Sequence, residues 1–303
     1  MDWIKQIRNI SSPYTIQKSN PVFHNTLNLF CFSFLILFYI FFSYIGSTFS
    51  LINIIISLFG LTFVFFSLFI LVVHEASHHM FFITKNIKIK KIINRLFAYP
   101  ITAISFQDFK TSWEIGHLQH HKDPINNKDP QNCPDFCLQG KELLLKILKV
   151  LFIPGQAVKV QSSCIQNKKD YFRGMIFGAL YWIPITIINF YVFNIWVTLI
   201  QLIAVNLTMV LNLIKVSMEH SGNLKEEANP ELRSMSSFFI GRHLIIPFNV
   251  SIHFEHHLVM NVPWYNLKKF HNEVFLLVPN EYKSKVYNLT AAEVIQKISG
   301  KRS

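Results

Sequence analysis

The sequence predicts an all-α integral membrane protein with four transmembrane helices in two hairpins and a cytoplasmic helical cap. Three observations predict this class. The 303-residue chain is 51% hydrophobic and only 15% charged, whereas soluble domains have about a quarter charged residues. The deficit is concentrated, because residues 19–73 and 174–214 contain no Asp, Glu, Lys or Arg. Most of the 13 histidines form three clusters outside these uncharged stretches.

Each uncharged stretch can supply two spans, since a helix needs about 20 mainly apolar residues to cross a bilayer. The alternative is that each stretch forms a buried helix pair in a soluble protein. The length of the two uncharged stretches argues against this alternative. We treat residues 1–303 as one domain, with a cap formed by residues 74–173 and 215–303. The expected spans are residues 27–45, 50–73, 174–192 and 195–214.

The placement of basic residues predicts the orientation of the spans. All 29 Lys and Arg lie outside the uncharged stretches, and the short connection within each expected hairpin has none. Basic residues beside spans mark the cytoplasmic side, so both termini and the middle segment are expected there, in a bacterial inner membrane or its equivalent. Contact with anionic lipid accounts for the net charge of +12, and nucleic acid is not indicated as a partner. Disulfides are not expected in a reducing cytoplasm.

The histidine clusters follow the patterns HxxxHH, HxxHH and HxxHH. On a helix that turns about 100° per residue, His74 and His78 share one face, and the other two clusters repeat the i, i+3, i+4 spacing. Each cluster can therefore direct two or three imidazoles at one point. The isolated His24, His243 and His271 are expected to cap helices or to lie at the membrane interface. The clusters comprise His74, His78, His79, His117, His120, His121, His253, His256 and His257.

Two chemistries compete for the first cluster. His74, Glu75 and His78 match H-E-x-x-H, the zinc protease motif in which the Glu is the general base. A zinc ion takes three or four protein ligands, so the protease interpretation leaves the other two clusters unexplained, whereas two metal ions use them all. A site at the membrane face that receives apolar substrate favours O₂ chemistry, which needs a metal that can be oxidised.

In the two-metal interpretation, Glu75 is expected to hydrogen-bond the distal N–H of a ligand histidine. A non-catalytic metal store or transporter is a further class. Transporters usually carry ionisable groups inside their spans, and the uncharged stretches have no Asp, Glu, Lys or Arg, which argues against this class.

Three segments resemble the membrane fatty acid desaturase superfamily, which includes sphingolipid desaturases and carotenoid and alkane hydroxylases. They read HEASHH, then GHLQHHKDP followed by DPQNCPDF, then FNVSIHFEHHLVMNVPWYNL. The resemblance implies a cap that holds two Fe²⁺ ions and uses O₂ as a co-substrate. It implies that the histidines of the three clusters are ligands, with His79 the least regular. It adds His220 as the lone ligand after the fourth span and Asn249 as a residue that holds a ligand or a water.

The resemblance also implies the reaction, which is introduction of a double bond into the acyl chain of a lipid. Electrons are expected from a separate ferredoxin or cytochrome b5-type donor, because the chain has no haem-binding HPGG segment. HLQHHKDP is also similar to carotenoid hydroxylases, so a carotenoid or alkyl hydroxylase or ketolase is the alternative. The H-E-x-x-H zinc protease is a remote alternative.

Overall fold

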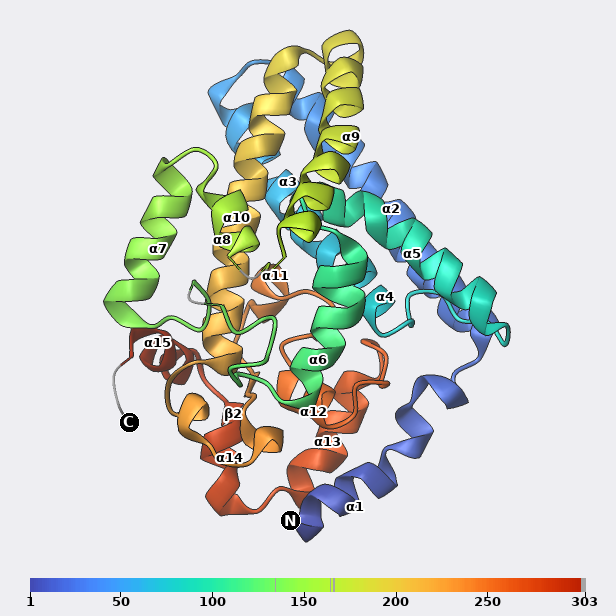
Figure 1. Ribbon diagram of the computed structural model, residues 1–303, viewed down its shortest axis with the longest axis vertical. Coiled ribbons are helices and arrows are strands. Elements are labelled where there is room, and N and C mark those ends of the chain that lie inside the picture. The colour runs from blue at the N-terminus through green and yellow to red at the C-terminus, as the bar shows by residue number, and fades with distance from the viewer. Residues whose placement is uncertain (134, 164, 166, 301–303) are drawn as a thin grey trace. The chain divides into compact units, whose positions relative to one another are not determined.

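The computed structural model describes residues 1–133, 135–163, 165 and 167–300 (Figure 1). The described residues are mostly helical and contain two short strands, which confirms the predicted all-α class. The strands β1 (Ser236–Ser237) and β2 (Tyr287–Asn288) pair in parallel. The chain divides into two compact units, which we call the membrane unit (residues 25–115 and 147–212) and the histidine unit (residues 1–24, 116–146 and 213–303).

Four helical segments are long and apolar enough to cross a membrane. They confirm the four predicted spans, and each is longer than predicted because the helix continues through polar residues at one or both ends. Figure 1 shows α9 and α10 as a hairpin joined by a short turn. The four segments are α2 (Pro21–Ser47), the continuous run of α3 (Leu51–Leu68), η3 (Phe69–His74) and α4 (Glu75–Ser77), then α9 (Lys168–Val192) and α10 (Ile195–His220).

Shorter helices complete the membrane unit. The side chain of Asn86 accepts hydrogen bonds from two backbone N–H groups in the first turn of α5 and so fixes where that helix begins. The segment η4 is a π-helical turn, as is η3. These helices are α5 (Ile87–Ala103), η4 (Lys110–Ile115), α8 (Gln156–Ser162) and the second half of α7 (Gly140–Phe152).

Close packing and a polar network hold the membrane unit together. Gly174 and Gly178 let α9 approach the segment after α5, since a Cβ at Gly178 would lie 2.0 Å from the Phe106 ring. Between the hairpin helices, Asn189 donates from Nδ2 to Gln201 Oε1 at 2.9 Å, and Gln201 donates from Nε2 to the Tyr39 hydroxyl at 2.9 Å. Side-chain hydrogen bonds of this kind tie helices together inside a bilayer.

The histidine unit has its own apolar core. Ile4 and Ile7 of α1, Phe254 of α12 and Phe270 of α13 are fully buried in one cluster. The core fixes α12, which carries the third histidine cluster. The helices of this unit are α1 (Asp2–Ile10), η1 (Ser12–Tyr14), η2 (Ile16–Lys18), α6 (Gly116–Lys122), η5 (Gly222–Glu226), η6 (Pro230–Leu232), α11 (Arg242–Ile245), α12 (His253–Leu258), α13 (Leu267–Leu277), α14 (Asn280–Val286) and α15 (Ala291–Ser299).

Candidate metal centre

The second histidine cluster lies on α6, and the loop that follows orients its rings. His120 Nδ1 lies 2.8 Å from Asp129 Oδ2, and His117 Nδ1 lies 3.1 Å from Gln131 Oε1. Burial alone would raise the pKa of Asp129, but hydrogen bonds from His120 and from two backbone N–H groups outweigh burial and lower it. Asp129 is therefore an ionised acceptor, so His120 donates from Nδ1, and the neutral ring that a metal needs has its lone pair on Nε2.

His220 is oriented in the same way at the end of α10. Its Nδ1 lies 2.9 Å from the carbonyl oxygen of Arg233. A carbonyl oxygen only accepts, so His220 also donates from Nδ1 and keeps a lone pair on Nε2. This hydrogen bond is the kind of contact that fixes the tautomer and the ring direction of a metal-bound histidine.

Four imidazoles of the histidine unit converge through these Nε2 atoms. The Nε2 atom of His220 lies 3.2 Å from that of His120 and 2.8 Å from that of His253, while His253 and His257 are 3.0 Å apart at Nε2. One ligand atom from each of the four rings lies within 4.8 Å of every other. Nitrogens bound about 2.1 Å from one metal ion lie about 3.0 to 3.4 Å apart, for ligand angles of about 90° to 109°, so the spacing is close to that around a shared ion.

The facing lone pairs of His120 and His220 are the observation that fits a cation best. In its neutral form each ring donates from Nδ1, so neither neutral ring has a proton on Nε2 to place between the two nitrogens. Two buried acceptors in contact repel each other, and unsatisfied buried polar atoms are costly. A cation bound by both nitrogens would remove this cost. The four-histidine group (His120, His220, His253 and His257) is therefore a suitable metal site.

Burial keeps several of the other clustered histidines neutral, as metal binding requires. Burial lowers the pKa of His117 to about 3, with a smaller contribution from the neighbouring His120, since two adjacent imidazolium ions would repel each other. The pKa values of His253 and His257 lie well below the usual value, first because of burial and then because of neighbouring histidines. These imidazoles offer lone pairs at neutral pH without first losing a proton.

A second set of histidines lies beside the first within the histidine unit. His117 and His121 are 3.2 Å apart at Nε2, and the rings of His121 and His256 have centroids 4.7 Å apart. In the membrane unit, His74 and His78 form a pair with ring centroids 5.2 Å apart. The structure thus keeps the histidines of each predicted cluster together, and it adds His220 to the histidines of the second and third clusters.

His79 has a different environment from the other clustered histidines. The helix ends at Ser77, and His79 adopts a left-handed backbone with φ of 57°. Its Nε2 lies 3.6 Å from Glu114 Oε1, and its side chain is 30% exposed. Burial lowers its pKa, although Glu114 opposes that shift. The assignment of His79 as a ligand stays a prediction.

The two residues predicted to support ligands differ in their contacts. Glu75 is buried, with Oε1 3.5 Å from His74 Nδ1, which is slightly beyond hydrogen-bond distance. Asn249 donates from Nδ2 to the carbonyl oxygen of Trp264 at 3.2 Å and has a positive φ of 55°. The role of each as a support for a ligand stays a prediction.

Sequence reasoning missed several polar residues around the histidines. Asp129 and Gln131 belong to the DPQ segment after the second cluster, and they contact His120 and His117. The acidic Asp129 in that segment is the sequence signal that could have indicated this role. His271 was expected at a helix end or the interface, but it is buried and donates to Glu255 from Nδ1. Glu255 also accepts a hydrogen bond from Ser236 Oγ. Both oxygens of this carboxylate, which lies between His253 and His256 in the sequence, therefore have partners outside the three histidine clusters.

The expectation of reduced cysteines is wrong for Cys133, which is disulfide-bonded. Sequence spacing does not reveal which sulfur atoms the fold brings to bonding distance, because that depends on the separation and direction of the two Cβ atoms.

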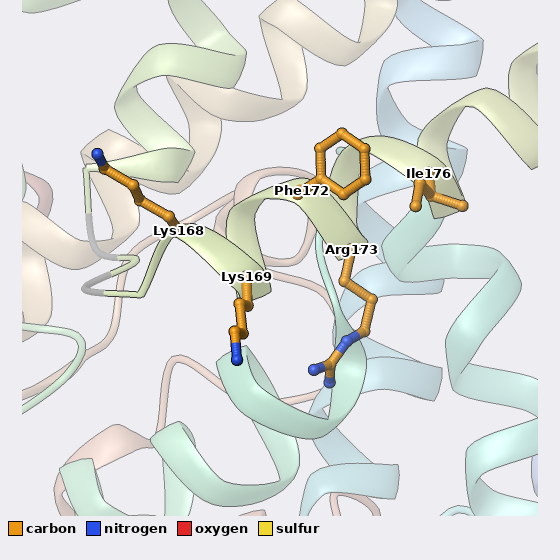
Figure 2. Close-up of a pocket in the computed structure, with 5 residues that line it drawn as sticks. All are labelled: Lys168, Lys169, Phe172, Arg173 and Ile176. Carbon is orange, nitrogen blue, oxygen red and sulfur yellow. The ribbon is translucent and has the colours of Figure 1, made fainter.

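A shallow pocket lies at the start of α9, and the five residues that line it include no histidine (Figure 2). Figure 2 shows the nitrogens of Lys169 and Arg173 on the same side of the helix. Arg173 is held by the buried Asp108, 2.8 Å away. The remaining lining residues are Lys168, Phe172 and Ile176. Basic groups next to apolar ones suit a helix that enters a membrane surface, and these five side chains offer no metal ligand.

The family model for fatty acid desaturases matches residues 48–286. A search of curated proteins gives no match to this chain. The matched segment is more than half of the chain and contains all ten histidines predicted as ligands.

Proposed function

We propose, from the premise that this chain belongs to the fatty acid desaturase family, that it introduces a double bond into the acyl chain of a membrane lipid in an O₂-dependent reaction. The family and the four membrane-length helices make it an integral membrane oxidoreductase that acts on acyl chains. The observation that carries the proposal is the convergence of four imidazoles, two of which have Nε2 atoms 3.2 Å apart.

Two iron ions would account for the histidines. We assign one ion to the four-histidine group. We assign the second ion to His117, His121 and His256 of the histidine unit. His74 and His78 stay predicted ligands, as the family resemblance implies. Bound iron supplies the one-electron redox chemistry that O₂ needs to attack an unactivated C–H bond.

The protein's own residues prepare this site. Asp129 and the Arg233 carbonyl direct the Nε2 atoms of His120 and His220 toward the site, and Gln131 positions His117. The buried apolar residues around α12 exclude water, which protects reactive species from side reactions.

The electron donor and the sidedness belong to the same proposal. We place the active site on the cytoplasmic side, because the basic residues that flank the spans favour that orientation. The net charge of +12 would steer an acidic ferredoxin or a cytochrome b5-type protein toward the site.

Expression in a host that lacks the corresponding activity tests the proposal. Membrane lipids should gain a new double bond in their acyl chains, detected by gas chromatography and mass spectrometry of fatty acid methyl esters. His121→Ala and His256→Ala should insert in the membrane normally and yield no new product. Purified wild-type protein should contain two irons by elemental analysis.

The same experiment separates the alternatives. Hydroxylated carotenoids or alkyl chains without new double bonds would replace the desaturase assignment with a hydroxylase of the same superfamily. One zinc ion per chain, with no oxidised lipid, would favour the protease interpretation and would overturn the proposal.

A further inference from the structure

Glu219 lies beside the four-histidine group and has no part in the ligand set described above. It occupies the last turn of α10, immediately before His220, and is 1% exposed. Its Oε2 accepts a hydrogen bond from Lys215 Nζ at 2.5 Å, one helical turn earlier. Lys215 is also buried, so a complete ion pair lies next to the imidazoles.

The contacts of Glu219 point toward the metal site. Its Oε2 lies 3.5 Å from His253 Nε2, the nitrogen that also lies 2.8 Å from His220 Nε2. Its second oxygen, Oε1, is buried and has no hydrogen-bond partner among the described residues. A carboxylate oxygen left without a partner in the protein interior is costly, and a cation held by the adjacent histidines would satisfy it.

Charge and ligand chemistry agree with this placement. Four neutral imidazoles add no negative charge beside a divalent ion in a buried site. Glu219 and Lys215 form an ion pair whose carboxylate lies 3.5 Å from His253 Nε2, so its negative member is next to the imidazoles. Lys215 donates to Oε2, the oxygen that lies near His253, and Oε1 is the oxygen that has no hydrogen-bond partner among the described residues. A carboxylate oxygen among imidazoles is a ligand combination found in non-haem iron sites.

We propose that Glu219 is a carboxylate ligand of the four-histidine metal site and that Lys215 positions it. The inference rests on the metal centre in the proposed function and is independent of the substrate. It gives this site mixed nitrogen and oxygen coordination.

Metal binding by the purified full-length protein in detergent tests the proposal. Glu219→Gln retains the shape of the side chain and removes its charge, and Glu226→Gln is the matched control because Glu226 is exposed in the same unit. We expect Glu219→Gln to weaken Fe²⁺ binding at one of two sites by about 10- to 100-fold, in the range typical for changes around a metal site. Glu226→Gln should match wild type. Fe²⁺ affinity is measured by competition with a chromogenic chelator.

A Co²⁺ spectrum gives a readout that does not depend on turnover. The visible absorption of Co²⁺ changes with coordination number and with the replacement of an oxygen ligand. Glu219→Gln should change this spectrum at equal occupancy, while Glu219→Asp should retain the wild-type features in part. A wild-type spectrum and wild-type Fe²⁺ affinity in Glu219→Gln would overturn the proposal.

The outcomes also distinguish this inference from the proposed function. A wild-type protein that desaturates lipid with two irons, together with an unaffected Glu219→Gln variant, would reject the Glu219 ligand and keep the function. A wild-type protein that binds Co²⁺ through Glu219 but forms no oxidised lipid would reject the function and keep the ligand.

Discussion

The two units contain buried polar networks of opposite kinds. In the membrane unit, Asn189 and Gln201 use their amide groups to link the hairpin helices, with Thr198 and Tyr39 as further partners. In the histidine unit, His120 and His220 direct lone pairs at each other, and Glu219 has an oxygen without a partner. A satisfied network stabilises a fold, whereas a network with converging unsatisfied acceptors is arranged for a ligand.

Removal of a converging imidazole should have the largest effect. His220→Ala should lose one of two bound irons and all product, because His220 contacts both His120 and His253 at Nε2. Elemental analysis and lipid profiling measure the two losses. Retention of both irons would show that the four-histidine group is a structural network after all.

Removal of a residue that orients an imidazole should have a smaller effect. Asp129→Asn leaves the shape but removes the charge that holds the Nδ1 proton of His120, so metal affinity should fall about 10- to 100-fold. Chelator competition measures the change, with the exposed Asp2→Asn as the control. Equal affinity in the two variants would mean that the tautomer of His120 is set by the metal alone.

Acid should destabilise the metal-free protein through the buried histidines. The folded-state pKa of His117 is about 3 and those of His253 and His257 lie well below the usual value, so the unfolded chain binds more protons below about pH 6.5. The free energy of unfolding should therefore fall as pH decreases from about 6.5 toward 3, by up to about 1.4 kcal/mol per pH unit for each such group.

Thermal unfolding of the metal-free protein at several pH values measures this loss. His117→Gln removes one of the responsible groups, so its stability should depend less steeply on pH than that of wild type. An unchanged slope in the variant would contradict a neutral buried His117.

A change in the hydrogen-bonded network of the membrane unit should have the smallest effect on stability and no effect on iron content. Gln201→Leu removes hydrogen bonds to Asn189 and Tyr39, and interhelical hydrogen bonds in membranes contribute about 0.6 kcal/mol on average and about 1.7 kcal/mol at most. Stability in detergent should fall by that amount while iron content stays at the wild-type value. Loss of iron in this variant would remove the distinction between the two networks.

Sequence patterns predicted some residues of the candidate site correctly and described others wrongly. The three histidine clusters were predictable, since i, i+3 and i+4 spacing places imidazoles on one helix face. The family was predictable from the resemblance of the three histidine-containing segments. The same rule failed to describe His79, because the helix ends at Ser77 and the backbone turns left-handed. His271 was also misplaced, since its burial depends on Glu255, sixteen residues earlier in the chain.

The sequence by itself determined the four apolar helices and the three histidine clusters, because hydrophobic length and residue chemistry are local properties. Only the tertiary structure decided which nitrogen of each ring faces the site and which carboxylates reach it. Asp129 and Arg233 set the tautomers of His120 and His220, and Lys215 holds Glu219 next to His253. Most of these contacts join segments that are far apart in the chain or separated by loops, so their geometry exists only after folding.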